Sequence, residues 1–189
     1  MGREFWNAVE ENQIIAAVKC MDDLEQCCKL EDIRVVFILF GDICSIGDIV
    51  KKIKAAGKLA MVHVDLIVGL SPREIAIEYL KNNTDADGII TTKPALIKKA
   101  KELSLYTVLR YFLLDSMAYE NIFTQQHTVH PDFIEVLPGA MPKVIQKLGS
   151  EIKVPVIAGG LIIDKESVMG ALSAGATAVS STNHNVWKL

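Results

Sequence analysis

Short, continuously apolar runs alternate with amphipathic segments along almost the whole chain, and this alternation constrains the fold more than any other feature. Residues 35–40 and 59–64 are apolar runs of strand length. Between them, Ile46, Ile49 and Ile53 recur at helical spacing. Repeating this reading predicts eight strands separated by seven helices, with the strands near residues 14–18, 35–40, 59–64, 88–90, 106–109, 133–136, 156–158 and 178–179.

Continuously apolar strands separated by helices indicate a parallel sheet that is covered on both faces. Eight such units favour a compact (β/α)₈ TIM-type barrel, which we expect to form a single domain over residues 1–189. Only residues 183–189 follow the last strand, so the last helix is expected to be truncated or missing. An open doubly wound sheet is the competing fold, but its G-x-G-x-x-G fingerprint after the first strand is absent.

The amino-acid composition and the net charge limit the classes of protein that this chain can represent. Half of the residues are hydrophobic and 23% are charged, which is typical of a well-buried globular protein. The net charge of -3 argues against a protein that coats nucleic acid nonspecifically. Specific RNA binding through a local basic face is still compatible with this charge. Two groups of lysines are candidates for such a face: 51, 52, 54 and 58, and 93, 98, 99 and 101. Lysines on helices more often form a merely solvated surface, however.

Cysteine usage and the missing export signals favour the cytoplasm. The cysteines at 20, 27, 28 and 44 show no metal-binding spacing, so we expect reduced thiols. We find neither a signal peptide nor an apolar run long enough to span a bilayer. No trio of metal ligands is evident, and His127 and His130 are expected to be solvated, so no metal is predicted.

Two consecutive strands near the end of the chain lead into small residues. Gly159-Gly160 follows the strand at 156–158, and Ser180-Ser181-Thr182 follows the strand at 178–179. Glycines let backbone N–H groups approach an anion, and hydroxyl groups add donors. In (β/α)₈ barrels, the loops after strands seven and eight often bind phosphate. We therefore predict a phosphate site at Gly159, Gly160, Ser180 and Ser181, whereas the alternative is a plain strand-to-helix turn.

Polar residues near the ends of four other strands should face the same mouth of the barrel. His63 and Asp65 share one side of the third strand, Lys93 follows the fourth, Arg110 ends the fifth, and Glu135 lies within the sixth. They could form an internal ion-pair network. They could instead be catalytic, with Asp65 or Glu135 as base, His63 as acid and Lys93 as an electrophile or Schiff-base amine. Equally, they could hold the hydroxyl groups of a polyol.

Several segments, in order, resemble the glycerol uptake operon antiterminator regulatory proteins: Met61 to Gly69, Arg110 to Ser116, Pro131 to Gly139, Pro155 to Gly160 and Gly175 to Ser181. Their Thr-Ser-Asn ending differs from Ser181-Thr182-Asn183 here. The resemblance implies a cytoplasmic, non-enzymatic regulator that senses glycerol 3-phosphate, needs no cofactor and acts on leader RNA to prevent transcription termination. It places phosphate on Gly159, Gly160, Ser180 and Ser181. The glycerol hydroxyl groups would then face Asp65, Arg110 and Glu135, with His63 and Lys93 nearby.

Two other functions fit the same barrel. One is a phosphosugar or phosphopolyol enzyme, because a fold does not fix a function. The other is a phosphate-ligand-binding protein without a role in RNA binding. The expected partners are thus a small phosphorylated ligand and leader mRNA, with no membrane; a homo-oligomer is compatible with the sequence, which does not identify the RNA-contacting face.

Overall fold

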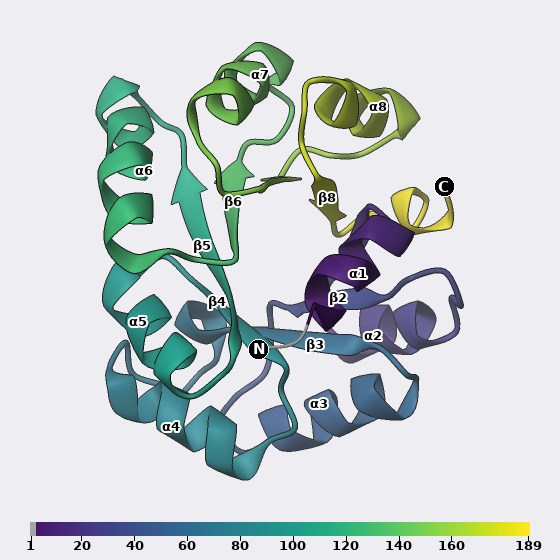
Figure 1. Cartoon of the computed structure of the whole chain (residues 1–189). Coiled ribbons are helices and arrows are strands. Elements are labelled where there is room, and N and C mark those ends of the chain that lie inside the picture. The colour runs from purple at the N-terminus through teal and green to yellow at the C-terminus, as the bar shows by residue number, and fades with distance from the viewer. Residues whose placement is uncertain (1–2) are drawn as a thin grey trace.

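The computed structural model describes residues 3–189 as a closed barrel of eight parallel strands, each paired with the next along the chain and the last with the first (Figure 1). This confirms the predicted TIM-type fold. The strands are β1 (Ile14–Val18), β2 (Val35–Ile38), β3 (Leu59–His63), β4 (Gly88–Thr91), β5 (Tyr106–Phe112), β6 (Phe133–Leu137), β7 (Val156–Gly159) and β8 (Ala178–Ser181).

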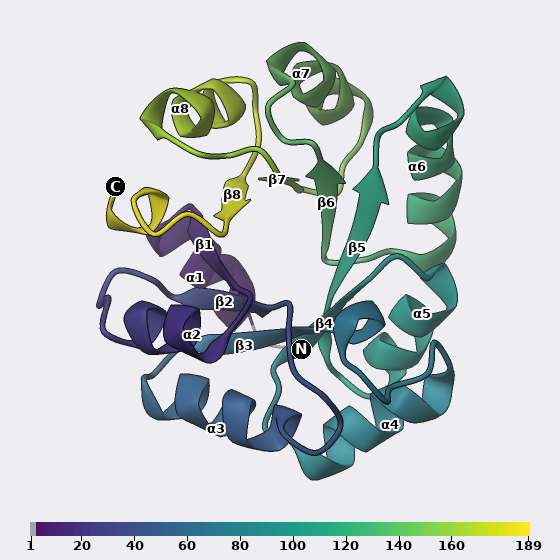
Figure 2. The same cartoon turned by 180° about the vertical axis from the view of Figure 1, so that it is seen from behind.

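Seven helices connect the strands and surround the barrel, as the sequence predicts (Figures 1 and 2). Their apolar faces pack on the outer surface of the sheet, which makes the larger of the two hydrophobic clusters. The helices are α2 (Met21–Cys28), α3 (Ile46–Ala55), α4 (Glu74–Asn83), α5 (Pro94–Glu102), α6 (Ser116–Val129), α7 (Pro142–Glu151) and α8 (Lys165–Ser173).

A further helix, α1 (Glu4–Glu11), precedes the first strand and was not predicted. It lies in front of the barrel in Figure 1 and behind it in Figure 2. Its buried side chains, Phe5 and Val9, join the inward-facing residues of the strands in one apolar cluster. The Phe5 ring lies 5.4 Å from Tyr106 and 4.8 Å from Phe133, residues that begin β5 and β6. Helix α1 therefore closes the N-terminal end of the barrel.

A short 3-10 turn, η2 (Val186–Lys188), follows β8 in the place where the earlier strands are followed by a long helix, as predicted. Its Trp187 is buried and donates a 2.7 Å hydrogen bond from Nε1 to the carbonyl oxygen of Ser181. Just before it, His184 Nε2 lies 2.7 Å from a carboxylate oxygen of Asp23 on α2. These two contacts link the end of the chain to β8 and to α2, the helix that follows β1.

Two local predictions were wrong in detail. Strand β5 does not end at Arg110 but continues to Phe112, so Arg110 lies within the strand. Asp65 does not share the inner side of β3 with His63, because a 3-10 turn, η1 (Val64–Leu66), begins directly after His63. Helix α6 is capped by Asp115, whose side chain accepts a hydrogen bond from Ala118 N.

Candidate functional site

A buried ion pair forms the floor of the barrel mouth. Arg110 on β5 and Glu135 on β6 are aligned in the strand register, and both point inward above the apolar cluster. Arg110 Nε donates to Glu135 Oε2 at 2.5 Å, and the side chains are 7% and 0% exposed. Ser180 on β8 donates its hydroxyl to Glu135 Oε1, also at 2.5 Å. The carboxylate is thus paired on both oxygens, as a buried charge requires.

The guanidinium of Arg110 keeps donors for another partner. Glu135 engages only Nε, and among the described residues no acceptor is found for the two Nη groups. The Nη groups are not buried without a partner, and Arg110 lines a cavity at the mouth. A guanidinium with free Nη groups is suited to binding an anion such as phosphate.

Gly159 provides space for this network. A Cβ atom at this position would lie 2.5 Å from Glu135 Oε1 and 2.7 Å from Ser180 Oγ, which is closer than van der Waals contact permits. The first glycine of the diglycine therefore lets the buried carboxylate and its serine partner approach the backbone of β7. Its role in the structure is to accommodate Glu135, in addition to any contact that it makes with a ligand.

The cavity above this floor has a volume of about 290 Å³ and combines polar and apolar walls. Arg110, Glu135, Ser180 and Ser181 supply polar atoms, and Gly160 belongs to the loop that forms one wall. The apolar lining residues are Ala17, Leu39, Leu137, Leu161, Ile162 and Ile163. The predicted phosphate residues and the Arg110–Glu135 pair are thus brought together at one place.

The loop after β7 contains backbone N–H groups beside this cavity that have no partner among the described residues. Gly160 and Leu161 have positive φ angles of 70° and 59°, and Leu161 is 68% exposed. A leucine in this conformation is strained, which is a common property of functional loops. Among the described residues, the N–H groups of Gly160, Leu161 and Thr182 donate no loop or side-chain hydrogen bond. They are therefore available to an anion.

The two serines of β8 are already engaged by the protein. Ser180 donates to Glu135, whereas Ser181 donates to the carbonyl oxygen of Ile162 at 2.6 Å and accepts from Asn183 N at 3.0 Å. Both side chains are buried. Their hydroxyl groups consequently fix the loops around the cavity, and the backbone groups beside them remain as the donors for a ligand.

His63 is close to this network but does not line the cavity. Its side chain is 2% exposed, and its Nδ1 atom is buried without a hydrogen-bond partner. Burial, together with the charge of nearby Arg110, lowers the pKa of His63 from 6.5 to about 4. The imidazole is therefore neutral at pH 7, and it is unsuited to act as a general acid at that pH.

Asp65 and Lys93 lie outside the cavity lining. Asp65 accepts hydrogen bonds from Thr91 Oγ1 at 2.8 Å and from Thr92 N at 2.7 Å, so it connects the loops after β3 and β4. Lys93 is exposed and is the N-cap residue of α5. The structure thus brings Arg110, Glu135 and the diglycine loop together and leaves Asp65 and Lys93 at the periphery.

Most lysines of the two candidate basic patches have partners. Lys54 forms an ion pair with Asp87 at 2.7 Å, Lys99 forms one with Glu78 at 2.7 Å, and Lys51 lies 3.8 Å from Asp48. The ammonium of Lys58 is buried and donates to the carbonyl oxygens of Leu30 and Ile33, and Lys101 donates to the carbonyl oxygen of His130. These lysines mainly support the fold, so the patches are poor candidates for a nucleic-acid surface.

Within residues 3–189 no three His, Cys, Asp or Glu side chains are arranged to hold a metal ion. The four cysteines form no disulfide. No helix of the described chain is both long and apolar enough to cross a bilayer.

The sequence reasoning missed the apolar collar of the cavity. Leu161, Ile162 and Ile163 follow the diglycine directly, and Leu161 and Ile163 are largely exposed. A run of three large apolar residues in a loop after a strand is itself a signal, because most loops at such positions are polar. This signal could have indicated a partly apolar cavity wall.

A closed parallel barrel whose mouth combines a buried Arg–Glu pair, a glycine turn and unpaired backbone donors defines the class: a (β/α)₈ protein whose mouth carries groups suited to an anion. A family model described as glycerol-3-phosphate responsive antiterminator matches residues 14–187. The chain belongs to this family. The resemblance to antiterminator regulators that the sequence indicated is thereby confirmed.

Individual relatives support the assignment. A glycerol uptake operon antiterminator regulatory protein from Listeria monocytogenes is 36% identical with a TM-score of 0.90, and the match covers 94% of this chain and 95% of that one. A related protein from Thermotoga maritima is 38% identical with a TM-score of 0.82, with 93% and 98% covered. The uncharacterized protein YgcP of Escherichia coli is 44% identical over 96% of this chain and 94% of its own length.

Enzymes share the fold at much lower identity. A deoxyribose phosphate aldolase from Aeropyrum pernix has a TM-score of 0.71 at 13% identity, with 100% of this chain and 97% of that chain covered. At this level of identity, the similarity shows the TIM-type architecture and nothing about the reaction.

Proposed function

We propose that this protein senses glycerol 3-phosphate at the barrel mouth and, in the ligand-bound state, acts on leader RNA of glycerol-utilisation transcripts to prevent termination. Family membership supports a glycerol-3-phosphate-responsive regulator. The observation that carries the proposal to this site is the Arg110 guanidinium, whose Nη groups are free in a cavity beside the diglycine loop. Effector and RNA would bind with reciprocal coupling, because each must favour the same conformation.

In this proposal the phosphate lies between Arg110 and the loop after β7. The positive charge of Arg110 and the backbone N–H groups of Gly160 and Leu161 would hold the phosphate oxygens. Glu135 fixes the guanidinium, and Ser180 fixes Glu135. The glycerol hydroxyl groups would occupy the rest of the cavity, next to the apolar collar of Leu161, Ile162 and Ile163.

We further propose that the site binds its ligand without turnover. The carboxylate of Glu135 is engaged on both oxygens, and His63 is neutral and outside the cavity lining. Neither group is therefore placed to exchange a proton with a ligand. Incubation with a panel of phosphopolyols and phosphosugars, followed by phosphorus NMR, should show no product; product formation would instead support the phosphopolyol enzyme.

Thermal unfolding with added ligands tests the effector. A ligand that binds only the folded state at about 100 times its Kd adds about 2.7 kcal/mol of stability. Glycerol 3-phosphate should raise the Tm clearly, whereas inorganic phosphate should raise it less and glycerol least. Equal shifts with inorganic phosphate and glycerol 3-phosphate would contradict recognition of the glycerol moiety.

Two variants test the placement of the ligand. Arg110→Lys keeps the charge that pairs with Glu135 but loses the planar fork, so the ligand-induced shift should fall strongly. Lys93→Gln is the matched control, because Lys93 is exposed and outside the cavity. A larger loss in Lys93→Gln than in Arg110→Lys would move the site toward the loop after β4.

A further inference from the structure

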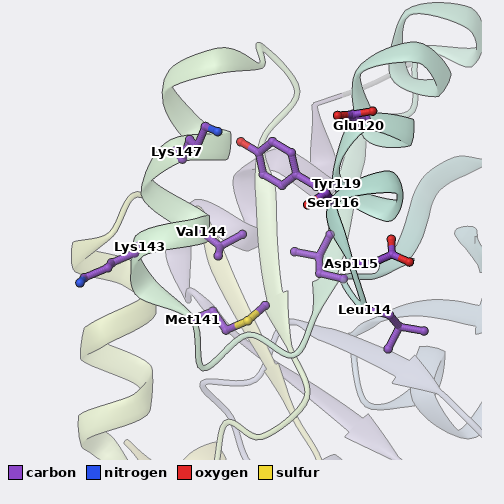
Figure 3. Close-up of a pocket in the computed structure, with 10 residues that line it drawn as sticks. Leu114, Asp115, Ser116, Tyr119, Glu120, Met141, Lys143, Val144 and Lys147 are labelled. Carbon is purple, nitrogen blue, oxygen red and sulfur yellow. The ribbon is translucent and has the colours of Figure 1, made fainter.

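A groove between α6 and α7 is the second feature of the mouth end that could take a ligand, and it has a volume of about 670 Å³ (Figure 3). Leu113, Met141 and Val144 supply its apolar lining, and Tyr119 projects from α6 toward α7. We propose that this groove is the RNA-contacting surface and that it binds an unpaired base with its neighbouring phosphates. This inference rests on the proposed function, since it identifies the face that RNA would use.

The aromatic ring in the groove is suited to stacking. Tyr119 is half-buried, its ring lies 5.3 Å from Phe123, and its hydroxyl donates to Glu151 at 3.0 Å. These contacts hold the ring in one orientation. The Lys147 ammonium lies 5.0 Å from the ring centroid. Such an exposed contact contributes only about 0.5–1 kcal/mol, whereas base stacking on an aromatic ring contributes about 1–3 kcal/mol, so a base can replace the ammonium.

The lysines of this groove form no ion pair, unlike several of those in the two patches considered above. Lys143 and Lys147 lie one helical turn apart on α7 and are exposed. Neither forms an ion pair among the described residues. Lys143 can therefore meet a phosphate directly, and Lys147 gives up only its contact with the Tyr119 ring. Of the acidic lining residues, Asp115 already caps α6, and Glu120 lies further along that helix (Figure 3).

The groove is directly connected to the effector site. Strand β5 carries Arg110 and continues into Leu113, and β6 carries Glu135 and continues toward Met141. Leu113 N also donates to the carbonyl oxygen of Leu137 at 2.8 Å, which ties the ends of the two strands together. The two strands that form the buried ion pair thus lead into the two walls of the groove. A change in the Arg110–Glu135 pair would alter the spacing of these walls.

Binding of a labelled leader RNA from a glycerol-utilisation operon, at several salt concentrations and with saturating glycerol 3-phosphate, tests the proposal. Lys143→Gln with Lys147→Gln should weaken binding about 10-fold or more and lower the salt slope by about 1–2. Tyr119→Leu, which keeps an apolar side chain, should weaken binding about 5-fold or more. The control, Lys51→Gln with Lys52→Gln, removes two exposed lysines of α3 and should bind RNA like the wild type.

Each outcome decides between the groove and the proposed function. Unchanged thermal shifts with glycerol 3-phosphate show that the variants are folded and that the effector site is intact. If the wild type binds RNA and the groove variants bind equally well, the groove assignment fails and the proposed function stands. If the wild type binds no leader RNA, the proposed function fails as well. If the substitutions change the molar mass in solution and not RNA binding, the groove is a self-association surface and the proposal is overturned.

Discussion

The two ends of the barrel differ in what fills them. At the N-terminal end, α1 inserts Phe5 against Tyr106 and Phe133, and the inward-facing strand residues there form an apolar cluster. At the C-terminal end, Arg110, Glu135 and Ser180 form a buried polar network beneath a cavity. Large exposed apolar side chains also lie in the loops of this end and in the adjoining ends of β5 and α6: Leu66, Val68, Phe112, Leu114, Met117, Leu161 and Ile163.

The difference suggests that the closed end mainly stabilises the fold and that the open end mainly serves ligand binding. Apolar burial stabilises the fold without presenting a group to a ligand, as at the closed end. A buried ion pair contributes little net stability compared with apolar residues of similar volume, because both charges lose their hydration. Its presence at the open end is better explained by the donors that Arg110 presents to the cavity. Substitutions at the two ends should therefore affect stability and ligand binding in different proportions.

The largest effect is expected from Glu135→Ala. The substitution leaves the Arg110 charge buried and unpaired, which should lower the free energy of unfolding by about 3–5 kcal/mol. Urea denaturation measures this loss. Replacing both partners, with Arg110→Met and Glu135→Met, should restore most of the stability and abolish the thermal shift with glycerol 3-phosphate. A loss below about 1 kcal/mol in Glu135→Ala would show that water solvates the charge and that the floor is not closed.

Acidification should reveal the next largest effect, through His63. Its pKa is near 4 in the folded protein and 6.5 ordinarily, so the unfolded chain binds the proton first as the pH falls. Stability should thus fall between pH 6.5 and pH 4, by about 3 kcal/mol in total from this group. The measurement is urea denaturation across this range. His63→Gln should show a flatter pH dependence, whereas His127→Gln, at an exposed position, should match the wild type.

Gly159→Ala should have an intermediate effect at the mouth. The added Cβ meets Glu135 Oε1 at 2.5 Å, and the displaced carboxylate should destabilise the protein by about 1–3 kcal/mol and weaken effector binding. Gly149→Ala is the matched control on α7, where the nearest atom lies at 3.8 Å. It should stabilise the helix by about 0.5–1 kcal/mol. Equal thermal midpoints for the two variants would mean that Glu135 and Ser180 can move away from the added Cβ without loss of stability.

The smallest effect is expected at the closed end. Phe5→Leu keeps an apolar side chain against Phe133 and should cost less than about 1.5 kcal/mol. Because Phe5 lies at the opposite end from the cavity, the dissociation constant for glycerol 3-phosphate, measured by calorimetry, should be unchanged. A substantial change in that constant would show that the two ends are coupled through the interior cluster.

The alternation of strands and helices was readable from the sequence because it depends on local periodicity. Helix α1 was not predicted, although Phe5 and Val9 are four residues apart on one face of it. A single helical turn of apolar spacing is a weak signal, and its burial depends on Phe133, which is far away in the sequence. Asp65 was misplaced because the two-residue period of a strand was extended into η1, where the backbone turns.

Several residues that line the cavity could be identified from the sequence, whereas their contacts could not. Arg110, Glu135 and Gly160 could be found because they lie at or near the ends of apolar strands, where a barrel exposes its mouth. That the hydroxyl of Ser180 is engaged by Glu135 could not be found, since the two residues are 45 positions apart and meet only when the barrel closes. The lysines of α7 that form no ion pair gave no separate signal, because pairing depends on neighbouring helices.

The way the barrel closes has a consequence for its dynamics. The β1–β8 pair is backed by η2, with the Trp187 indole bonded to Ser181, where other pairs are backed by helices of at least eight residues. Fewer buried contacts protect the backbone amides along this line, so local opening should start there. In hydrogen exchange, the amides of β8 should exchange before those of β5 and β6. Since β8 carries Ser180, a bound effector would slow exchange most in the strand that opens first.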